Sequence, residues 1–92
     1  MSGEARYALK ILKGAQKDKE KVKQIPALRK NVEELLAIIR ENPFQNPPPY
    51  EKLVGNMRGM YSRRINKQHR LVYEVDEEAK LVRIVSMWTH YE

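Results

Sequence analysis

The sequence has no cysteine and only two histidines among its 92 residues. The lack of cysteine excludes disulfide bonds, thiolate metal sites and cysteine nucleophiles, and it fits the reducing cytoplasm. Two histidines are too few for a metal site, so we expect neither a metal nor a cofactor. The apolar runs are too short to cross a bilayer and no signal peptide is visible, which predicts a cytoplasmic protein without a membrane partner.

The motifs of the common catalytic and nucleotide-binding classes are missing as well. The chain contains no Walker loop, dinucleotide fingerprint, zinc motif or nucleophile elbow. It does have a formal net charge of +6. A charge of this size indicates a polyanionic partner, and the absence of a basic amphipathic helix with aromatic anchors favours nucleic acid over a membrane surface.

Positive charge is concentrated in the stretch "RGMYSRRINKQHR", residues 58–70. This stretch contains five arginines and lysines and no acidic residue. The five cations are Arg58, Arg63, Arg64, Lys67 and Arg70, and His69 precedes the last of them. Most charge runs are solvated faces, so the role of this one depends on the rest of the chain.

The first half of the chain predicts a strand and two helices. Residues 6–12 alternate weakly in polarity, which predicts an edge strand ending near Gly14. Residues 15–24 predict a helix that stops near Lys23, because a residue before proline is pushed away from helical dihedrals. A second helix restarts at Pro26 and ends at Asn42, with apolar residues at spacings of three and four. These are Leu28, Val32, Leu35, Leu36 and Ile39.

The second half predicts a long loop and an antiparallel meander. The loop, residues 42–59, contains four prolines and two glycines, and its interspersed apolar residues favour an ordered conformation. The predicted strands cover 60–65, 69–75 and 81–91. Arg63 and Arg64 must point to opposite faces of the first of these strands, since successive side chains alternate. We therefore predict a single α+β domain over residues 1–92.

Metal-free cleavage of RNA is a chemistry that these residues can support. The RNA supplies the nucleophile, its 2'-hydroxyl, so the protein needs a base, an acid and cations that stabilise the transition state. Glu51 in the proline-rich loop is a candidate base, His90 is a candidate acid, and the strand arginines are candidate cations. The same residues fit a solvated carboxylate, an exposed histidine and a solubilised sheet edge. Residue chemistry alone therefore ends at a basic protein that binds nucleic acid.

A longer sequence pattern narrows the choice between a protein that cleaves RNA and one that only binds nucleic acid. The run "ENPF", the segment "YEKLVGNMRGMYSRRINKQHRLVYEV" and the terminal "HY" resemble the Txe/YoeB family of bacterial toxins, within the RelE superfamily of ribosome-dependent mRNA interferases. The similarity covers roughly residues 6–91. Its most specific part is G-x-[YW]-S-R-R-I-x-x-x-H-R-L-V-Y, residues 59–73. The resemblance implies a RelE-like fold, with an N-terminal strand and two helices packed on a small, mainly antiparallel twisted sheet.

The resemblance also implies roles for individual residues. The general base of the family falls on Glu51, and the arginine that stabilises the scissile phosphate falls on Arg70. The general acid falls on His90, and the tyrosine that helps to position the substrate falls on Tyr91. Contacts with RNA or the ribosome are expected from the other basic residues of the motif region. These are Arg58, Arg63, Arg64, Lys67 and His69, with a salt bridge left open as the alternative for Arg64.

The function implied by this resemblance is that of the toxin of a type II toxin–antitoxin system. It would enter the A site of the 30S ribosomal subunit, contact ribosomal RNA, and cut mRNA there to leave a 2',3'-cyclic phosphate. The implied partner is a YefM/Axe-like antitoxin with an acidic segment that folds on binding, and operator DNA would be bound only through that complex. The alternative is a non-catalytic module on the same scaffold that binds RNA or a protein.

Overall fold

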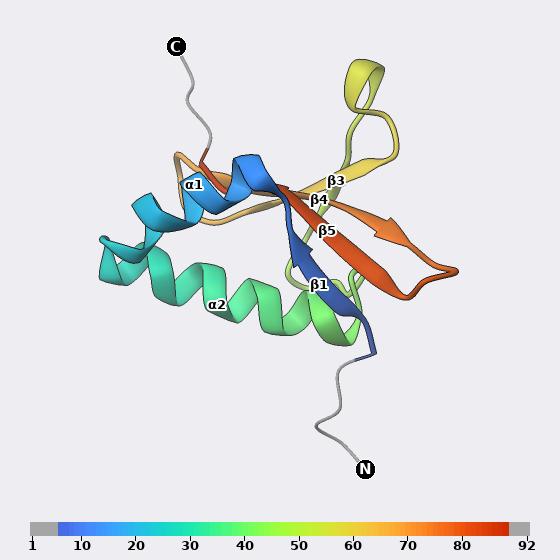
Figure 1. Ribbon diagram of the computed structural model, residues 1–92, viewed down its shortest axis with the longest axis horizontal. Helices are drawn as coiled ribbons and strands as arrows, with labels where there is room; N and C mark the ends of the chain where they lie inside the picture. Colours follow the sequence, from blue (N-terminus) through green and yellow to red (C-terminus); the bar gives the residue numbers. More distant parts are fainter. Residues whose placement is uncertain (1–5, 89–92) are drawn as a thin grey trace.

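The computed structural model describes residues 6–88, so the predicted site residues His90 and Tyr91 lie outside the described residues. The chain forms five strands, two α-helices and one short 3-10 helix in this range (Figure 1). In chain order they are β1 (Ala8–Ile11), α1 (Lys13–Lys23), α2 (Pro26–Glu41), β2 (Glu51–Lys52), a 3-10 helix (Gly55–Met57), β3 (Met60–Arg64), β4 (Arg70–Asp76) and β5 (Leu81–Ser86).

The strands form one sheet in the order β1-β5-β4-β3-β2. The pairs β2–β3, β3–β4 and β4–β5 are antiparallel, and β1 is added parallel to β5 at the far edge. A parallel neighbour needs a long crossover, and here α1 and α2 lie within it. The predicted α+β class, edge strand and mainly antiparallel sheet are confirmed.

The second helix forms as its sequence predicts. Pro26 occupies the first turn, where its missing N–H leaves no hydrogen bond unmade, and Asn42 is the C-cap. The residues buried along the helix recur at spacings of four, three and four, which places them on one stripe. They are Leu28, Val32, Leu35 and Ile39.

The first helix starts earlier than predicted. It ends at Lys23 as expected, but it begins at Lys13, so Gly14 lies in its first turn and does not mark the end of the strand. Leu12 explains the difference. Its N–H still donates to Ile84 O across the sheet, while its carbonyl already accepts from Gln16 N as the first helical bond. The strand therefore passes into the helix without an intervening turn.

One hydrophobic core joins the two helices to one face of the sheet. Ala15 and Val22 of α1 lie in the same cluster as the buried residues of α2. The sheet contributes alternate residues, since period-2 alternation gives each strand one buried side. The fully buried ones are Leu71, Tyr73, Val82 and Ile84. The opposite face of β3 and β4 carries Ser62, Arg64, Arg70 and Glu74, and this face holds the candidate site.

A β-bulge interrupts the alternation of the last strand. Val72 pairs with Ser86 and the next residue, Tyr73, pairs with Ile84, so Val85 is an extra residue on β5. Met87 consequently joins Ile84 in the core, three residues further on. A regular strand over the predicted range 81–91 would place these two side chains on opposite faces. That prediction is wrong, because the bulge shifts the register and β5 ends at Ser86.

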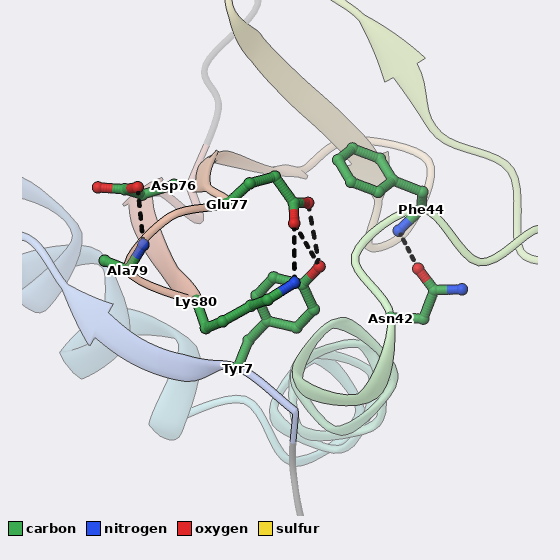
Figure 2. A network of polar contacts seen from close by, with 7 residues as sticks. All are labelled: Tyr7, Asn42, Phe44, Asp76, Glu77, Ala79 and Lys80. Atoms are coloured by element: carbon green, nitrogen blue, oxygen red, sulfur yellow. Dashed lines mark hydrogen bonds and ion pairs between the residues drawn. The ribbon is translucent and has the colours of Figure 1, made fainter.

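The first strand is tied to the far end of the β4–β5 hairpin by a polar network (Figure 2). The Tyr7 hydroxyl donates to both carboxylate oxygens of Glu77, at 3.1 and 3.0 Å. The Lys80 ammonium donates to the same carboxylate at 3.1 Å and lies 5.1 Å from the Tyr7 ring centroid. These contacts join residues 70 positions apart in the sequence.

None of the helices in residues 6–88 is long and apolar enough to cross a bilayer.

The predicted loop is ordered and contains two short elements. Glu51 and Lys52 form β2 at the sheet edge, and the 3-10 helix follows on a segment that projects away from the helices (Figure 1). Gly55 and Gly59 have φ values of 68° and 94°. These are left-handed conformations that glycine adopts without steric cost, which explains the glycines at both ends of this turn.

Candidate functional site

Strand register brings Glu51 and Arg70 together across three strands. Glu51 on β2 pairs with Ser62 on β3, which pairs with Val72 on β4. Arg70 lies two residues before Val72 and therefore shares its face of the sheet. Two predicted site residues that are 19 positions apart thus lie on the same face of the sheet.

Arg70 makes specific contacts with both neighbours. Its Nε donates to Ser62 Oγ at 3.0 Å, and its Nη2 donates to Glu51 Oε1 at 3.1 Å. The Glu51 side chain remains 68% exposed, whereas that of Arg70 is 21% exposed. An ion pair with one partner this exposed contributes about 0–1 kcal/mol to stability. The pair therefore does little to hold the fold, and its carboxylate is accessible to a ligand.

A cleft opens beside this cluster, with a volume of ≈ 460 Å³. Its lining contains three cations and a single carboxylate, which favours an anionic ligand. The lining residues are Pro48, Pro49, Glu51, Arg64, Ile65, Asn66, Lys67 and Arg70. Arg64 and Lys67 are exposed, so both can reach a ligand from the rim.

The cleft wall is shaped by hydrogen bonds to the turn between β3 and β4. Asn66 Oδ1 accepts from the backbone N–H groups of Gln68 and His69, at 2.8 and 2.7 Å, and so fixes the turn that presents Lys67. Asn31 Nδ2 of α2 donates to Ile65 O at 3.1 Å. Sequence reasoning missed Asn66 and Ser62 as site residues. Alternation along the strand, which puts Ser62 on the same face as Arg64, was the available signal for Ser62.

Arg63 is not an RNA-binding residue in this structure. Its side chain has no exposed surface, and its hydrogen bonds go to the Tyr73 hydroxyl and to backbone carbonyls of the proline-rich loop. Alternation explains this, because the strand sends Arg63 toward the helices and Arg64 toward the cleft. The prediction of an RNA contact for Arg63 is wrong, since a buried guanidinium offers no surface to a ligand.

The prediction of an RNA contact for His69 is wrong for the same reason. It is 4% exposed, and its ring stacks on Trp88 with centroids 4.1 Å apart. The Lys21 ammonium lies on the same indole, 5.3 Å from its centroid. His69 therefore packs the end of the described chain against the sheet and presents no face to RNA.

Arg58 lies apart from the candidate site. It is exposed, and it lines a second cleft of ≈ 360 Å³ together with Lys52 and Tyr61, on the projecting segment that follows β2. Its exposed position fits contact with a large polyanion. Neither Glu51 nor Arg70 lines this second cleft. Residues 6–88 contain no group of three or more histidine, cysteine or acidic side chains placed to hold a metal ion.

Comparison with known proteins gives consistent matches. The family model described as the YoeB-like toxin of bacterial type II toxin-antitoxin systems matches residues 14–91. Toxin YoeB of Escherichia coli K12 is 40% identical over 53 residues, which are 58% of this chain and 63% of that protein. The match therefore spans less than two thirds of the length of that relative.

Solved structures agree with the sequence comparison. The YoeB–YefM toxin–antitoxin complex of Staphylococcus aureus contains a chain with 37% identity and a TM-score of 0.80, covering 95% of this chain and 100% of that one. A chain of the archaeal RelE–RelB complex from Pyrococcus horikoshii has 22% identity and a TM-score of 0.73, covering 90% and 93%, which shows a shared fold. Because the family model spans most of the chain, from residue 14 to residue 91, the chain belongs to the YoeB-like toxins of bacterial type II toxin–antitoxin systems.

Proposed function

We propose that this toxin is a ribosome-dependent endoribonuclease that cuts mRNA in the A site without a metal. The observation that carries the proposal is the open, cation-lined cleft in which Arg70 lies 3.1 Å from the Glu51 carboxylate. A base and a phosphate-binding cation are two of the three groups that 2'-hydroxyl attack needs from the protein, and the third is an acid.

In the proposed reaction Glu51 accepts the proton of the 2'-hydroxyl. The 2'-oxygen then forms a bond to the adjacent phosphorus, and the bond to the 5'-oxygen of the next nucleotide breaks. Arg70 stabilises the added charge on the phosphate, and a planar guanidinium suits two phosphate oxygens at once. His90 gives a proton to the leaving 5'-oxygen, and Tyr91 helps to orient the substrate. The products are a 2',3'-cyclic phosphate and a 5'-hydroxyl.

The ion pair between Arg70 and Glu51 fits a resting state of this site. A bound phosphate would compete with the Glu51 carboxylate for the Nη2 donor of Arg70. Substrate binding would then release the carboxylate at the moment when it must accept a proton. Arg64 and Lys67, both exposed at the rim of the cleft, would hold the neighbouring phosphates.

The proposed partners follow from the same chemistry. The Staphylococcus relative was solved with YefM, and we propose a YefM/Axe-like antitoxin for this chain, with an acidic segment that covers the basic cleft. Ribosomal RNA of the 30S A site and mRNA would be the polyanionic targets, and operator DNA would be reached only through the antitoxin complex. The proposed place of action is the cytoplasm.

Primer extension on ribosome-bound mRNA tests the proposal. The wild-type protein should produce A-site breaks that survive added chelator, and Glu51→Ala or His90→Ala should abolish them while ribosome binding persists. Glu74→Gln is a matched control, since Glu74 lies on the same face of β4 but is paired with Arg83 at 3.6 Å outside the cleft. Normal cutting by both alanine variants would show that the acid and base are assigned wrongly. Wild-type protein that binds ribosomes and makes no breaks would support the non-catalytic module instead.

A further inference from the structure

The loop that leads into Glu51 accepts several hydrogen bonds from the buried side chain of Arg63. Arg63 on β3 donates from Nη1 to Pro48 O at 2.6 Å, and from Nη2 to Pro43 O at 2.9 Å and Gln45 O at 2.8 Å. Residues 43–50 form neither helix nor strand. The guanidinium therefore supplies three of the hydrogen bonds that a regular element would otherwise give to this segment.

The environment of Arg63 argues against a purely stabilising role. The side chain is fully buried, and it forms no ion pair with the described residues 6–88. Burying an unpaired cation is costly, and apolar replacements of buried ions are often neutral or stabilising. A fold selected for stability alone would accept an apolar residue here, whereas only a guanidinium can span several carbonyls with fixed geometry.

An aromatic cluster connects the guanidinium to the site. The Arg63 guanidinium carbon lies 5.1 Å from the ring centroid of Tyr50, the residue directly before Glu51. Tyr50 in turn packs on Tyr61 and Phe44, with centroids 5.8 and 6.0 Å apart. Arg63 thus contacts Tyr50, the residue directly before Glu51, and also binds the carbonyl of Pro48, which lines the cleft.

We propose that Arg63 is a positioning residue for the candidate active site. By holding the carbonyls of the loop and the ring of Tyr50, it fixes both the wall of the cleft and the approach of Glu51 to Arg70. This inference rests on the proposed function, and it adds a residue that acts without touching the RNA.

Arg63→Lys is the direct test. A lysine keeps the charge, but its single ammonium cannot reach three carbonyls and the Tyr73 hydroxyl together. We expect kcat for cleavage of ribosome-bound mRNA to fall by about 100-fold, the scale of a misplacement near 1 Å. The KM should change by less than about threefold, because Arg63 has no exposed surface with which to bind the ribosome. Amide hydrogen exchange should rise in residues 44–52 and stay unchanged in β4 and β5.

Two further variants distinguish a loss of loop positioning from a general loss of protein stability. Val32→Ala removes a buried methyl pair in the middle of α2, away from the loop, and serves as the destabilised control measured at a temperature where both proteins are folded. Tyr50→Leu alters a half-buried ring instead of a buried cation, so it tests the same connection if Arg63→Lys does not fold. We expect roughly a tenfold loss of kcat for Tyr50→Leu at unchanged KM.

The outcomes can be told apart. If Arg63→Lys cuts mRNA with the kcat of the wild-type protein, the positioning role is overturned and the proposed function still stands. A wild-type kcat in Tyr50→Leu has the same meaning if the lysine variant does not fold. An equal kcat loss in Val32→Ala overturns it too, because stability would then explain the effect. If the wild-type protein does not cut mRNA, the proposed function is wrong. In that case, unchanged amide hydrogen exchange of residues 44–52 in Arg63→Lys would still refute the inference that Arg63 holds the loop.

Discussion

Tyr73 connects the sheet to the proline-rich loop at the level of a single hydroxyl. Its side chain has no exposed surface, and the hydroxyl accepts from Arg63 Nε at 3.1 Å and donates to Pro43 O at 2.7 Å. Burial raises the pKa of Tyr73 above its ordinary value of 10.0, and the nearby Arg63 guanidinium partly opposes this shift. The folded protein therefore favours the neutral hydroxyl.

Tyr73→Phe should reveal this preference as a pH dependence. Above the ordinary pKa of 10.0 the unfolded chain loses the Tyr73 proton while the folded chain retains it, so the free energy of unfolding should fall as pH rises. Urea unfolding between about pH 9 and about pH 11 should show a smaller fall for the variant. Near pH 8 the variant should be less stable by about 1–2 kcal/mol, because Pro43 O and Arg63 Nε each lose a hydrogen-bond partner. Parallel curves for the two proteins would contradict this account.

At the scale of secondary structure, α2 is the element on which the core depends. Ile39 is fully buried at its C-terminal end, whereas Ile25, its N-cap, is 42% exposed. Ile39→Ala should lower the free energy of unfolding by about 2–5 kcal/mol, through lost burial and a cavity. Ile25→Ala removes the same atoms from a surface position and should cost below about 1 kcal/mol. Chemical denaturation of both variants measures the difference, and similar losses would show that α2 is not packed as described.

Elements with local causes were predictable from sequence, and those with distant causes were not. The stripe of α2 and its start at Pro26 are written in residue spacing and proline chemistry. The bulge at Val85 left no such sign, because the alternating pattern of β5 continues through it. The burial of Arg63 depends on carbonyls of a loop whose path the sequence does not define. For the site, the structure places Glu51 beside Arg70, whereas the catalytic roles of Glu51, Arg70, His90 and Tyr91 stay predictions.

At the scale of the whole molecule, the network of Tyr7, Glu77 and Lys80 closes the sheet at its β1 edge. The hydrogen bonds from Lys80 and Tyr7 lower the pKa of Glu77 below its ordinary value of 4.5. A lowered carboxyl pKa adds stability that is present above pH 4.5 and is lost as pH falls through the folded-state pKa.

Glu77→Gln should therefore flatten the acid limb of the stability curve. Thermal unfolding from about pH 3 to about pH 7 should show a larger acid-induced drop in Tm for the wild-type protein than for the variant. Glu78→Gln is the matched control, since Glu78 is the exposed neighbour in the same turn. An acid limb that Glu78→Gln flattens as much as Glu77→Gln would indicate a general charge effect in place of this network.

The parallel pairing of β1 with β5 has a consequence for the synthesis of the protein. The second strand of this pair, residues 81–86, is made after every other helix and strand of the described chain, so the first strand has no parallel partner while those elements are synthesised. Contacts between such distant segments form late in folding. A nascent chain therefore cannot complete its sheet before residues 81–86 have left the ribosome. For a toxin proposed to attack ribosomes, this order of events delays completion of the sheet until residues 81–86 are clear of the ribosome that made them.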